Sequence, residues 1–278
     1  MTLVGRLADL DARLRDAGPL LVAFSGGADS AFLLAAAVRA VGPDDVVAAT
    51  AVSPSLATTE LPAARAFAAS LGVRHLTPGT DELSRPGYVA NGPDRCFHCK
   101  ATLLDTLRPL AEGRAVATGT NADDAVAGFR PGISAAARRG ALTPLLDAGL
   151  TKADVREASR QWGLVTADKP AAACLASRIA YGVQVTTAGL ARVDRAEASV
   201  RSALSPVDVR VRDLGEGRAR LELDPVALAA VDDVVLAAVR AEGFTDVVAA
   251  PFRSGSMNAG LVDRGLLDVP HAAGSAPP

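Results

Sequence analysis

The chain has 278 residues, of which 49% are hydrophobic and 22% are charged, a balance typical of a globular protein that can bury a core. Its 29 basic and 31 acidic residues give a net charge of −2, which excludes a general cationic surface for holding nucleic acid. No apolar run is long enough to span a membrane, no signal pattern opens the chain, and three cysteines are too few for a disulfide framework, so we expect a cytoplasmic protein.

The first half of the chain alternates short apolar strands with helices. We predict strands at 20–24, 46–52, 73–76 and 115–119, with helices at 29–41, 59–71 and 96–107. Short strands separated by helices are typical of an α/β fold in which a parallel sheet carries helices on both faces. We assign residues 1–167 to this domain, including a last helix that a capping-box pattern at Thr151 and Asp154 opens and that runs to residue 162.

The second half predicts a junction and a smaller domain. Residues 168–185 contain proline, glycine and alanine with little periodicity, which indicates a loop. A small α+β domain is predicted over 186–264, with helices at 187–203 and 225–241 and strands at 209–213, 219–223 and 246–250. Asp224 followed by proline is a typical helix start. Residues 265–278 are predicted to be a disordered tail.

Residues 25–30, Ser-Gly-Gly-Ala-Asp-Ser, lie where a predicted strand meets a predicted helix. Two glycines allow a sharp turn that presents backbone N–H groups to an anion, and the helix amino terminus adds partial positive charge. A glycine-rich turn without a ligand is the alternative, but this spacing is more specific than a pair of glycines and differs from the Walker and dinucleotide motifs. We predict a nucleotide site formed by Ser25, Gly26, Gly27, Asp29 and Ser30, with Asp29 holding Mg²⁺ or fixing the loop.

This pattern resembles the loop of the PP-loop pyrophosphatases, which split ATP between the α and β phosphates and adenylate their substrates. A second polar cluster, residues 118–124, ends another predicted strand. Ligands collect at the carboxyl ends of strands in an open parallel sheet, so both clusters should face one crevice. Asp123 or Asp124 could bind Mg²⁺ on the pyrophosphate, and Arg130 could clamp a phosphate or carboxylate, although a helix-capping turn is the alternative. The candidate nucleotide-binding residues here are Gly119, Thr120, Asn121, Asp123, Asp124 and Arg130.

Cys96 and Cys99 form a C-x-x-C pair at the start of a predicted helix, and Cys174 is the third cysteine. Three thiolates are one ligand short for zinc unless His98 or His75 joins them. They suit an iron–sulfur cluster with one open iron. Spacing alone leaves both metals open, together with a redox dithiol or unrelated buried thiols.

Cys174 lies in the junction between two cations. Lys169 and Arg178 would favour its thiolate, and a cysteine on a loop beside a nucleotide crevice suits a sulfur donor or nucleophile. An inert apolar residue is the alternative. We take Cys174, Asp29 and Arg178 as the candidate catalytic residues.

Together these motifs resemble the LarE family of ATP-dependent sulfur transferases. The resemblance covers residues 20–258 and rests on the stretches 25–30, 93–100, 119–124, 130–132, 169–178 and 253–258. It implies that ATP adenylates a carboxylate of pyridinium-3,5-dicarboxylate mononucleotide, and that sulfur then displaces AMP to leave a thiocarboxylate. The reaction would be run once on each ring carboxylate, in the synthesis of the nickel-pincer nucleotide cofactor of lactate racemase. The resemblance further implies a homo-oligomer and a handover to a nickel-inserting protein of the same pathway.

The number of cysteines distinguishes two variants of this family. In single-cysteine members the residue matching Cys174 gives up its own sulfur. The additional Cys96 and Cys99 match the variant in which three cysteines hold a 4Fe-4S cluster that carries the transferred sulfide. Cys96, Cys99 and Cys174 are therefore the implied metal ligands, and the sulfur source stays open between the cluster and Cys174. The implied substrate residues, for which solvated surface is the alternative, are Glu197, Arg212, Glu222 and Arg253.

Three other functions compete with this one. A tRNA thiolase of the PP-loop class would be expected to carry a basic surface or an RNA-binding domain, which the charge of −2 disfavours. An amidotransferase resembling NAD or GMP synthetase would need no cysteines. A non-catalytic nucleotide-binding module with structural zinc would contain zinc without iron. We therefore expect a small-molecule nucleotide substrate and neither a nucleic-acid nor a membrane partner.

Overall fold

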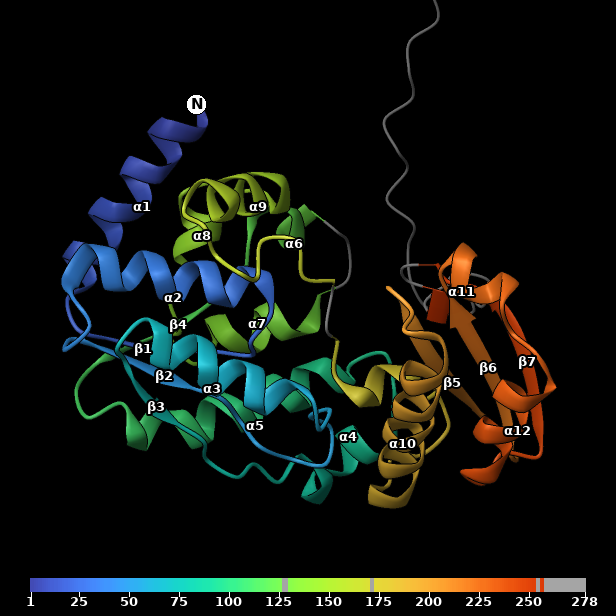
Figure 1. The fold of residues 1–278 in the computed structure, drawn as a ribbon. Helices are drawn as coiled ribbons and strands as arrows, with labels where there is room; N and C mark the ends of the chain where they lie inside the picture. The colour runs from blue at the N-terminus through green and yellow to red at the C-terminus, as the bar shows by residue number, and fades with distance from the viewer. Residues whose placement is uncertain (127–129, 171–172, 254–255, 258–278) are drawn as a thin grey trace, which may run out of the picture.

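The computed structural model describes residues 1–126, 130–170, 173–253 and 256–257. These residues contain a four-stranded and a three-stranded sheet (Figure 1). In the larger sheet all strands are parallel and lie in the order β3-β2-β1-β4, which confirms the predicted fold. Its strands are β1 (Leu20–Ala23), β2 (Val46–Ala49), β3 (Arg74–Leu76) and β4 (Ala115–Thr118).

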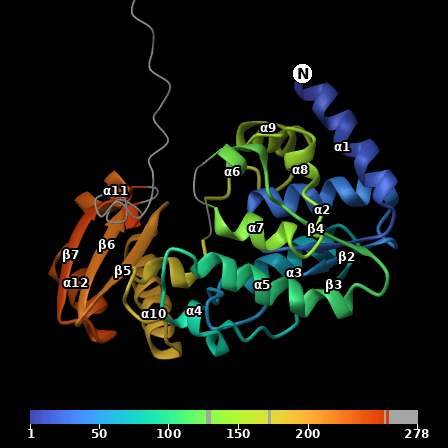
Figure 2. The same ribbon diagram turned by 180° about the vertical axis from the view of Figure 1, so that it is seen from behind.

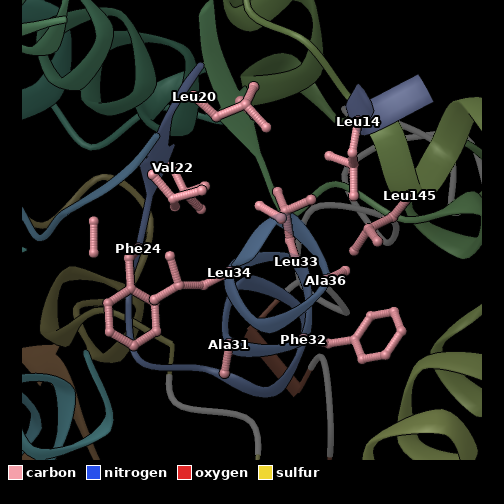
Figure 3. Packing of buried hydrophobic residues seen from close by; sticks show 14 of the residues in the cluster. Leu14, Leu20, Val22, Phe24, Ala31, Phe32, Leu33, Leu34, Ala36 and Leu145 are labelled. Atoms are coloured by element: carbon pink, nitrogen blue, oxygen red, sulfur yellow. The ribbon is translucent and has the colours of Figure 1, made fainter. Parts of the chain in front are cut away.

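Helices cover both faces of the parallel sheet (Figures 1 and 2). Successive strand residues point to opposite faces, so Leu20 and Val22 join one core while Leu21 joins the other. Figure 3 shows the larger core, in which Val22 and Phe24 lie beside Leu34. The helices of the larger core include α1 (Leu3–Ala17), α2 (Ala28–Val41), α3 (Glu60–Ser70) and α9 (Lys152–Gln161), and α5 (Arg95–Leu107) packs on the other face.

Two local predictions in this domain are confirmed. Helix α2 is buried over most of its length, as its nearly continuous apolar sequence predicts. The capping box of α9 is present, because the Thr151 hydroxyl accepts from the Asp154 amide over 3.2 Å and the Asp154 carboxylate accepts from the Thr151 amide over 2.9 Å.

Helix α1 and several short helices are absent from the predicted elements, because they are too short or too polar to stand out by periodicity. The short helices are η1 (Glu82–Ser84), α4 (Pro86–Val89), η2 (Arg108–Leu110), α6 (Ala122–Val126), α7 (Pro131–Ala137), α8 (Pro144–Asp147) and η3 (Leu175–Arg178). In the part of the chain that is described, no helix is both long and apolar enough to cross a membrane.

The second sheet has the order β5-β6-β7, with an antiparallel pair β5–β6 and a parallel pair β6–β7. Apolar side chains of α10 and α12 pack against it in a second core, which also includes Tyr88 of the first domain and Leu175 of the junction. A small α+β unit thus follows the parallel sheet, as predicted. Its elements are α10 (Thr187–Leu204), β5 (Val209–Gly215), β6 (Arg218–Leu223), α11 (Pro225–Ala229), α12 (Asp233–Ala241) and β7 (Asp246–Pro251).

The prediction of one helix over 225–241 is wrong. Asp224 caps α11 as expected, accepting from the amide of Ala227 over 3.1 Å. However, Asp232 caps a new helix, α12, by accepting from the amide of Val235 over 2.9 Å. Aspartate competes well for amides at a helix start, so the chain breaks before it. The predicted tail, 265–278, and residues 254, 255 and 258 of the 253–258 stretch lie outside the described residues.

Two buried side chains, Asn91 and Arg95, attach the junction to the first domain by hydrogen bonds. Asn91 Nδ2 donates to the carbonyl oxygens of Ala180 and Val183, each over 2.8 Å. Arg95, at the start of α5, donates to the Ala176 carbonyl over 2.8 Å and to Asn91 Oδ1 over 2.6 Å. These bonds hold the segment after Cys174 against the helix that carries Cys96 and Cys99.

Candidate active site

A cavity of about 790 Å³ lies at the carboxyl ends of the parallel strands. Residues of the 25–30 loop, of the ends of β2 and β4, and of α5 form part of its wall. Residues of the junction, α10 and β5 complete the lining. The loop, the second polar cluster and the cysteines therefore meet in one cavity, at the edge where a parallel sheet binds ligands.

The 25–30 loop turns tightly between β1 and α2. Gly26 has φ +76°, a conformation that favours glycine. Ser30 Oγ donates to the Gly27 carbonyl over 3.1 Å and lies 3.1 Å from Ser25 Oγ. Ser25, Gly27, Asp29 and Ser30 line the cavity, so the loop can offer amides and hydroxyls to an anion there.

Gly119 allows the end of β4 to approach this loop closely. A Cβ atom at Gly119 would lie 2.8 Å from the Ser30 amide nitrogen, closer than real contacts allow. Thr120 follows in the cavity wall. Asn121 is fully buried and its Oδ1 accepts from the Asp124 amide over 3.1 Å, so it fixes the turn that carries Asp124.

The two adjacent carboxylates after β4 have different surroundings. Asp123 Oδ2 accepts from the Lys152 amide over 2.8 Å, at the start of α9. Asp124 lines the cavity and pairs with Lys152 Nζ over 3.1 Å. Burial raises the pKa of Asp29, and the neighbouring Asp124 carboxylate raises it further. Two carboxylates that disfavour each other's charge are a donor set that fits Mg²⁺.

All three thiols line this cavity. Cys96 and Cys174 are exposed, and Cys99 is half-buried. Burial raises the pKa of Cys99, and the neighbouring Cys174, Glu82 and Cys96 raise it further, so the three cysteines influence one another electrostatically. Within the described ranges, no group of three or more His, Cys, Asp and Glu side chains is close enough to hold a metal ion.

The two histidines considered as further zinc ligands have other contacts. His75 Nε2 lies 2.8 Å from Thr50 Oγ1, and burial lowers the pKa of His75. His98 Nε2 lies 3.1 Å from Asp94 Oδ2. Neither contact brings a fourth ligand to the cysteines.

The two cations flanking Cys174 in sequence are paired with carboxylates. Lys169 Nζ contacts Glu60 Oε2 over 2.6 Å and donates to the Gly26 carbonyl over 3.0 Å. Arg178 Nε donates to Glu197 Oε1 over 2.9 Å, and its Nη1 donates to the Cys174 carbonyl over 3.3 Å. The predicted stabilisation of a Cys174 thiolate by these cations finds no support in these contacts. Arg178 instead fixes the backbone of the loop.

Arg178, Glu197 and Arg210 also line the cavity. Burial, together with the nearby Arg178 and Arg212 cations, lowers the pKa of Arg210 to about 10. Arg212 forms a buried ion pair with Glu222 over 2.9 Å.

Of the four residues implied as substrate contacts, Glu197 thus lies in the cavity wall, and Arg212 and Glu222 form the buried pair behind it. Arg253 is exposed, next to residues outside the described part of the chain. Arg130, predicted as an anion clamp, is also exposed and contributes to the wall.

Several cavity residues are absent from the predicted site. Glu82 is buried and its Oε1 accepts from the hydroxyls of both Ser53 and Ser55. Lys100 also lines the cavity. Its position directly after Cys99 is the sequence signal that could have identified it as a site residue. Other charged or polar residues that line the cavity outside the predicted site include Tyr181, Arg210, Asp194 and Arg201. Arg210 alternates with valines in β5. This pattern is typical of a strand with one exposed face, so the sequence does not indicate that Arg210 is buried.

Two known proteins resemble this chain in sequence. No model of a known protein family matches the chain. The chain is 33% identical over 265 residues to the pyridinium-3,5-bisthiocarboxylic acid mononucleotide synthase of Lactiplantibacillus plantarum, over 92% of this chain and 95% of that protein. It is 44% identical over 208 residues to an uncharacterised protein of Synechocystis, over 74% of this chain and 76% of the relative. The first of these matches extends over both sheets and the junction between them.

Proposed function

The chain belongs to the LarE family, and we propose that it is an ATP-dependent sulfur transferase acting on pyridinium-3,5-dicarboxylate mononucleotide. It would adenylate a ring carboxylate and convert it to a thiocarboxylate. The observation that carries this proposal is the meeting of an anion-binding loop and three thiols in one cavity. A nucleotide site alone would not need the thiols, and a thiol site alone would not need the loop.

The first step of the proposed reaction is adenylation. The amides of the 25–30 loop and the hydroxyls of Ser25 and Ser30 would bind the phosphates of ATP. Asp29 and Asp124 would hold Mg²⁺, which neutralises charge on the pyrophosphate as it leaves. The substrate carboxylate attacks the α phosphorus, so AMP stays on the substrate and pyrophosphate is released.

The second step is the transfer of sulfur. Cys96, Cys99 and Cys174 are a donor set that fits a 4Fe-4S cluster with one open iron, and such a cluster would supply a site for sulfide. Because the three thiols do not form a ready metal group in the described residues, cluster binding requires them to approach one another. Arg95 and Arg178 hold the backbone at Cys174 and just after it, by donating to the carbonyl oxygens of Ala176 and Cys174 respectively. The alternative source is the sulfur of Cys174 itself.

The remaining groups of the cavity suit the substrate. Arg178, Arg210 and Glu197 together leave one net positive charge in the cavity wall, which favours the phosphate of a mononucleotide. Glu197 pairs with Arg178, and Arg212 forms a buried ion pair with Glu222. Arg253 and the handover to a nickel-inserting protein stay predictions, as does the homo-oligomer.

The test is anaerobic purification with iron and sulfide quantification, followed by turnover with ATP and the mononucleotide. We expect AMP and pyrophosphate as products; stoichiometric ADP and orthophosphate would rule out the adenylation mechanism. Single Cys→Ala changes at Cys96, Cys99 and Cys174 should each abolish both iron binding and sulfur transfer. They should leave adenylation intact, because the phosphate loop contains none of the cysteines.

Two results would select a different function or sulfur source. A metal-free protein that is active for one turnover, with Cys174 lighter by the mass of hydrogen sulfide in an intact-mass spectrum, would identify Cys174 as the donor. Salt-sensitive tRNA binding, with loss of a thiolated base when the gene is deleted, would favour the tRNA thiolase.

A further inference from the structure

The chain contains only three lysines, and they differ in their pairing. Lys152 pairs with Asp124 over 3.1 Å, and Lys169 pairs with Glu60 over 2.6 Å. Lys100 lines the cavity and, within the described residues, makes no ion pair with a carboxylate. A partly buried cation without a counter-ion is costly, so this position indicates that an anion binds beside it.

Lys100 lies in the wall of the cavity that both the thiols and the phosphate loop line. Burial lowers the pKa of Lys100, while the nearby Cys99, Cys96 and Asp124 raise it. Asp124 in turn acts on Asp29 of the phosphate loop. Lys100 lines the same cavity as the thiols and as Asp29 and Asp124, the carboxylates proposed to hold Mg²⁺.

The helix that carries Lys100 is held firmly. Cys96, Cys99 and Lys100 are spaced by three and four residues, so they share one face of α5. Helix α7 packs on this face: a Cβ atom at Gly132 would lie 3.6 Å from the Cys96 carbonyl oxygen and 3.8 Å from Lys100 Cβ. The stem of Lys100 is thus fixed relative to the thiols.

We propose that Lys100 is a catalytic residue of sulfur transfer, whose ammonium group binds the α-phosphate of the acyl-adenylate and stabilises AMP as it leaves. This inference rests on the proposed function. In the step, a bond forms between sulfur and the acyl carbon, and the bond from that carbon to the phosphate oxygen breaks. AMP departs with the electron pair and gains a negative charge, which Lys100 offsets by charge-assisted hydrogen bonds without giving up a proton. The same role applies whether the sulfur comes from sulfide or from Cys174.

The experiment replaces Lys100 by Met, which removes the charge and keeps the length, and by Arg, which keeps the charge. Arg108→Met is the matched control, because Arg108 is an exposed cation just beyond the end of the same helix. With ATP and pyridinium-3,5-dicarboxylate mononucleotide, three quantities are measured: ATP–pyrophosphate exchange, the rate of AMP release from the acyl-adenylate, and bound iron.

We expect Lys100→Met to slow AMP release by about 100-fold, the loss seen when one charge-stabilising donor is removed from an active site. Exchange should fall by much less, because the phosphate loop shares the stabilisation of the first step. Acyl-adenylate should accumulate, iron content should be unchanged, and Lys100→Arg should recover part of the rate. Where Lys100→Met is poorly folded by circular dichroism, Lys100→Gln repeats the measurement.

The outcomes separate this inference from the proposed function. Wild-type protein that forms no AMP and pyrophosphate overturns both. Active wild type with equal AMP release in Lys100→Met overturns only the role of Lys100. Loss of iron in Lys100→Met also overturns it, because Lys100 would then support the thiols rather than the leaving group.

Discussion

The ion pair between Arg178 and Glu197 fixes the Cys174 loop to the second sheet. The two residues are 3% and 4% exposed. Arg178 binds both carboxylate oxygens, over 2.9 and 3.2 Å, and Glu197 Oε1 also accepts from the Val211 amide of β5 over 3.1 Å. Replacing Glu197 by Gln keeps its shape and removes its charge, which leaves the Arg178 cation buried without its bidentate partner.

The expected effect on stability follows from this burial. Removing one partner of a buried pair costs about 3–5 kcal/mol, because the remaining charge is uncompensated. The Gln carbonyl can still accept one bond from Arg178, so we expect the lower end, a loss of about 3 kcal/mol in the free energy of unfolding. The double change Arg178→Met with Glu197→Met removes both charges of this pair and should cost less than the sum of the two single changes.

Urea unfolding followed by far-ultraviolet circular dichroism measures these differences. Glu242→Gln is the control. Glu242 pairs with Arg195, which lies on α10 as Glu197 does but is 58% exposed. We therefore expect Glu242→Gln to lower the free energy of unfolding by less than about 1 kcal/mol. Two results would refute the reasoning: Glu197→Gln no more destabilising than the control, or a double variant whose loss equals the sum.

Two further predictions concern the first domain. Gly119→Ala would bring a Cβ atom to 2.8 Å from the Ser30 amide nitrogen. We expect the displaced loop to bind ATP less tightly: an overpacking cost of about 1–3 kcal/mol corresponds to a loss of affinity of roughly 5- to 150-fold, measured by calorimetry. Gly79→Ala, with no atom within 4 Å of its Cβ, should bind ATP normally, and equal affinities would contradict the steric argument. Burial alone would raise the pKa of Asp154, but hydrogen bonds from Thr151 and the Arg6 cation outweigh it and lower that pKa. The stability that Asp154 contributes is therefore present above its unfolded pKa of about 3.9 and is lost as pH falls through the folded value. Asp154→Asn should lower the free energy of unfolding by about 1 kcal/mol at neutral pH and make that free energy decrease less steeply as the pH falls. Parallel acid-unfolding curves for the wild type and the variant would show that the Asp154 carboxylate does not cause the loss of stability in acid.

The parallel sheet could be predicted because its strands are short, apolar and separated by helices. Leu20–Ala23 and Val46–Ala49 are buried on both faces, which gives continuous apolar runs. The meeting of the 25–30 and 118–124 clusters follows from topology alone, since both end parallel strands that are neighbours in the sheet.

Side-chain direction could not be predicted in the same way. Asp123 and Asp124 are adjacent in one turn, and neighbouring helical residues point about 100° apart, so either could face the cavity on sequence grounds. The structure turns Asp123 toward the Lys152 amide and leaves Asp124 beside Asp29. Pairings between distant residues, such as that of Lys169 with Glu60, leave no local pattern in the sequence.

The approach of Cys174 to the C-x-x-C pair depends on residues that carry no chemistry of their own. Asn91 donates to two carbonyls of the junction, and Arg95, one residue before Cys96, reaches the Ala176 carbonyl. Helix α5 therefore presents Arg95 to the junction, and Cys96, Cys99 and Lys100 to the cavity. A change that loosens Arg95 or Asn91 would move Cys174 away from the other thiols without touching a thiol or the phosphate loop. In this protein the geometry of sulfur transfer is thus coupled to the packing of the junction, whereas the geometry of ATP binding depends on the parallel sheet.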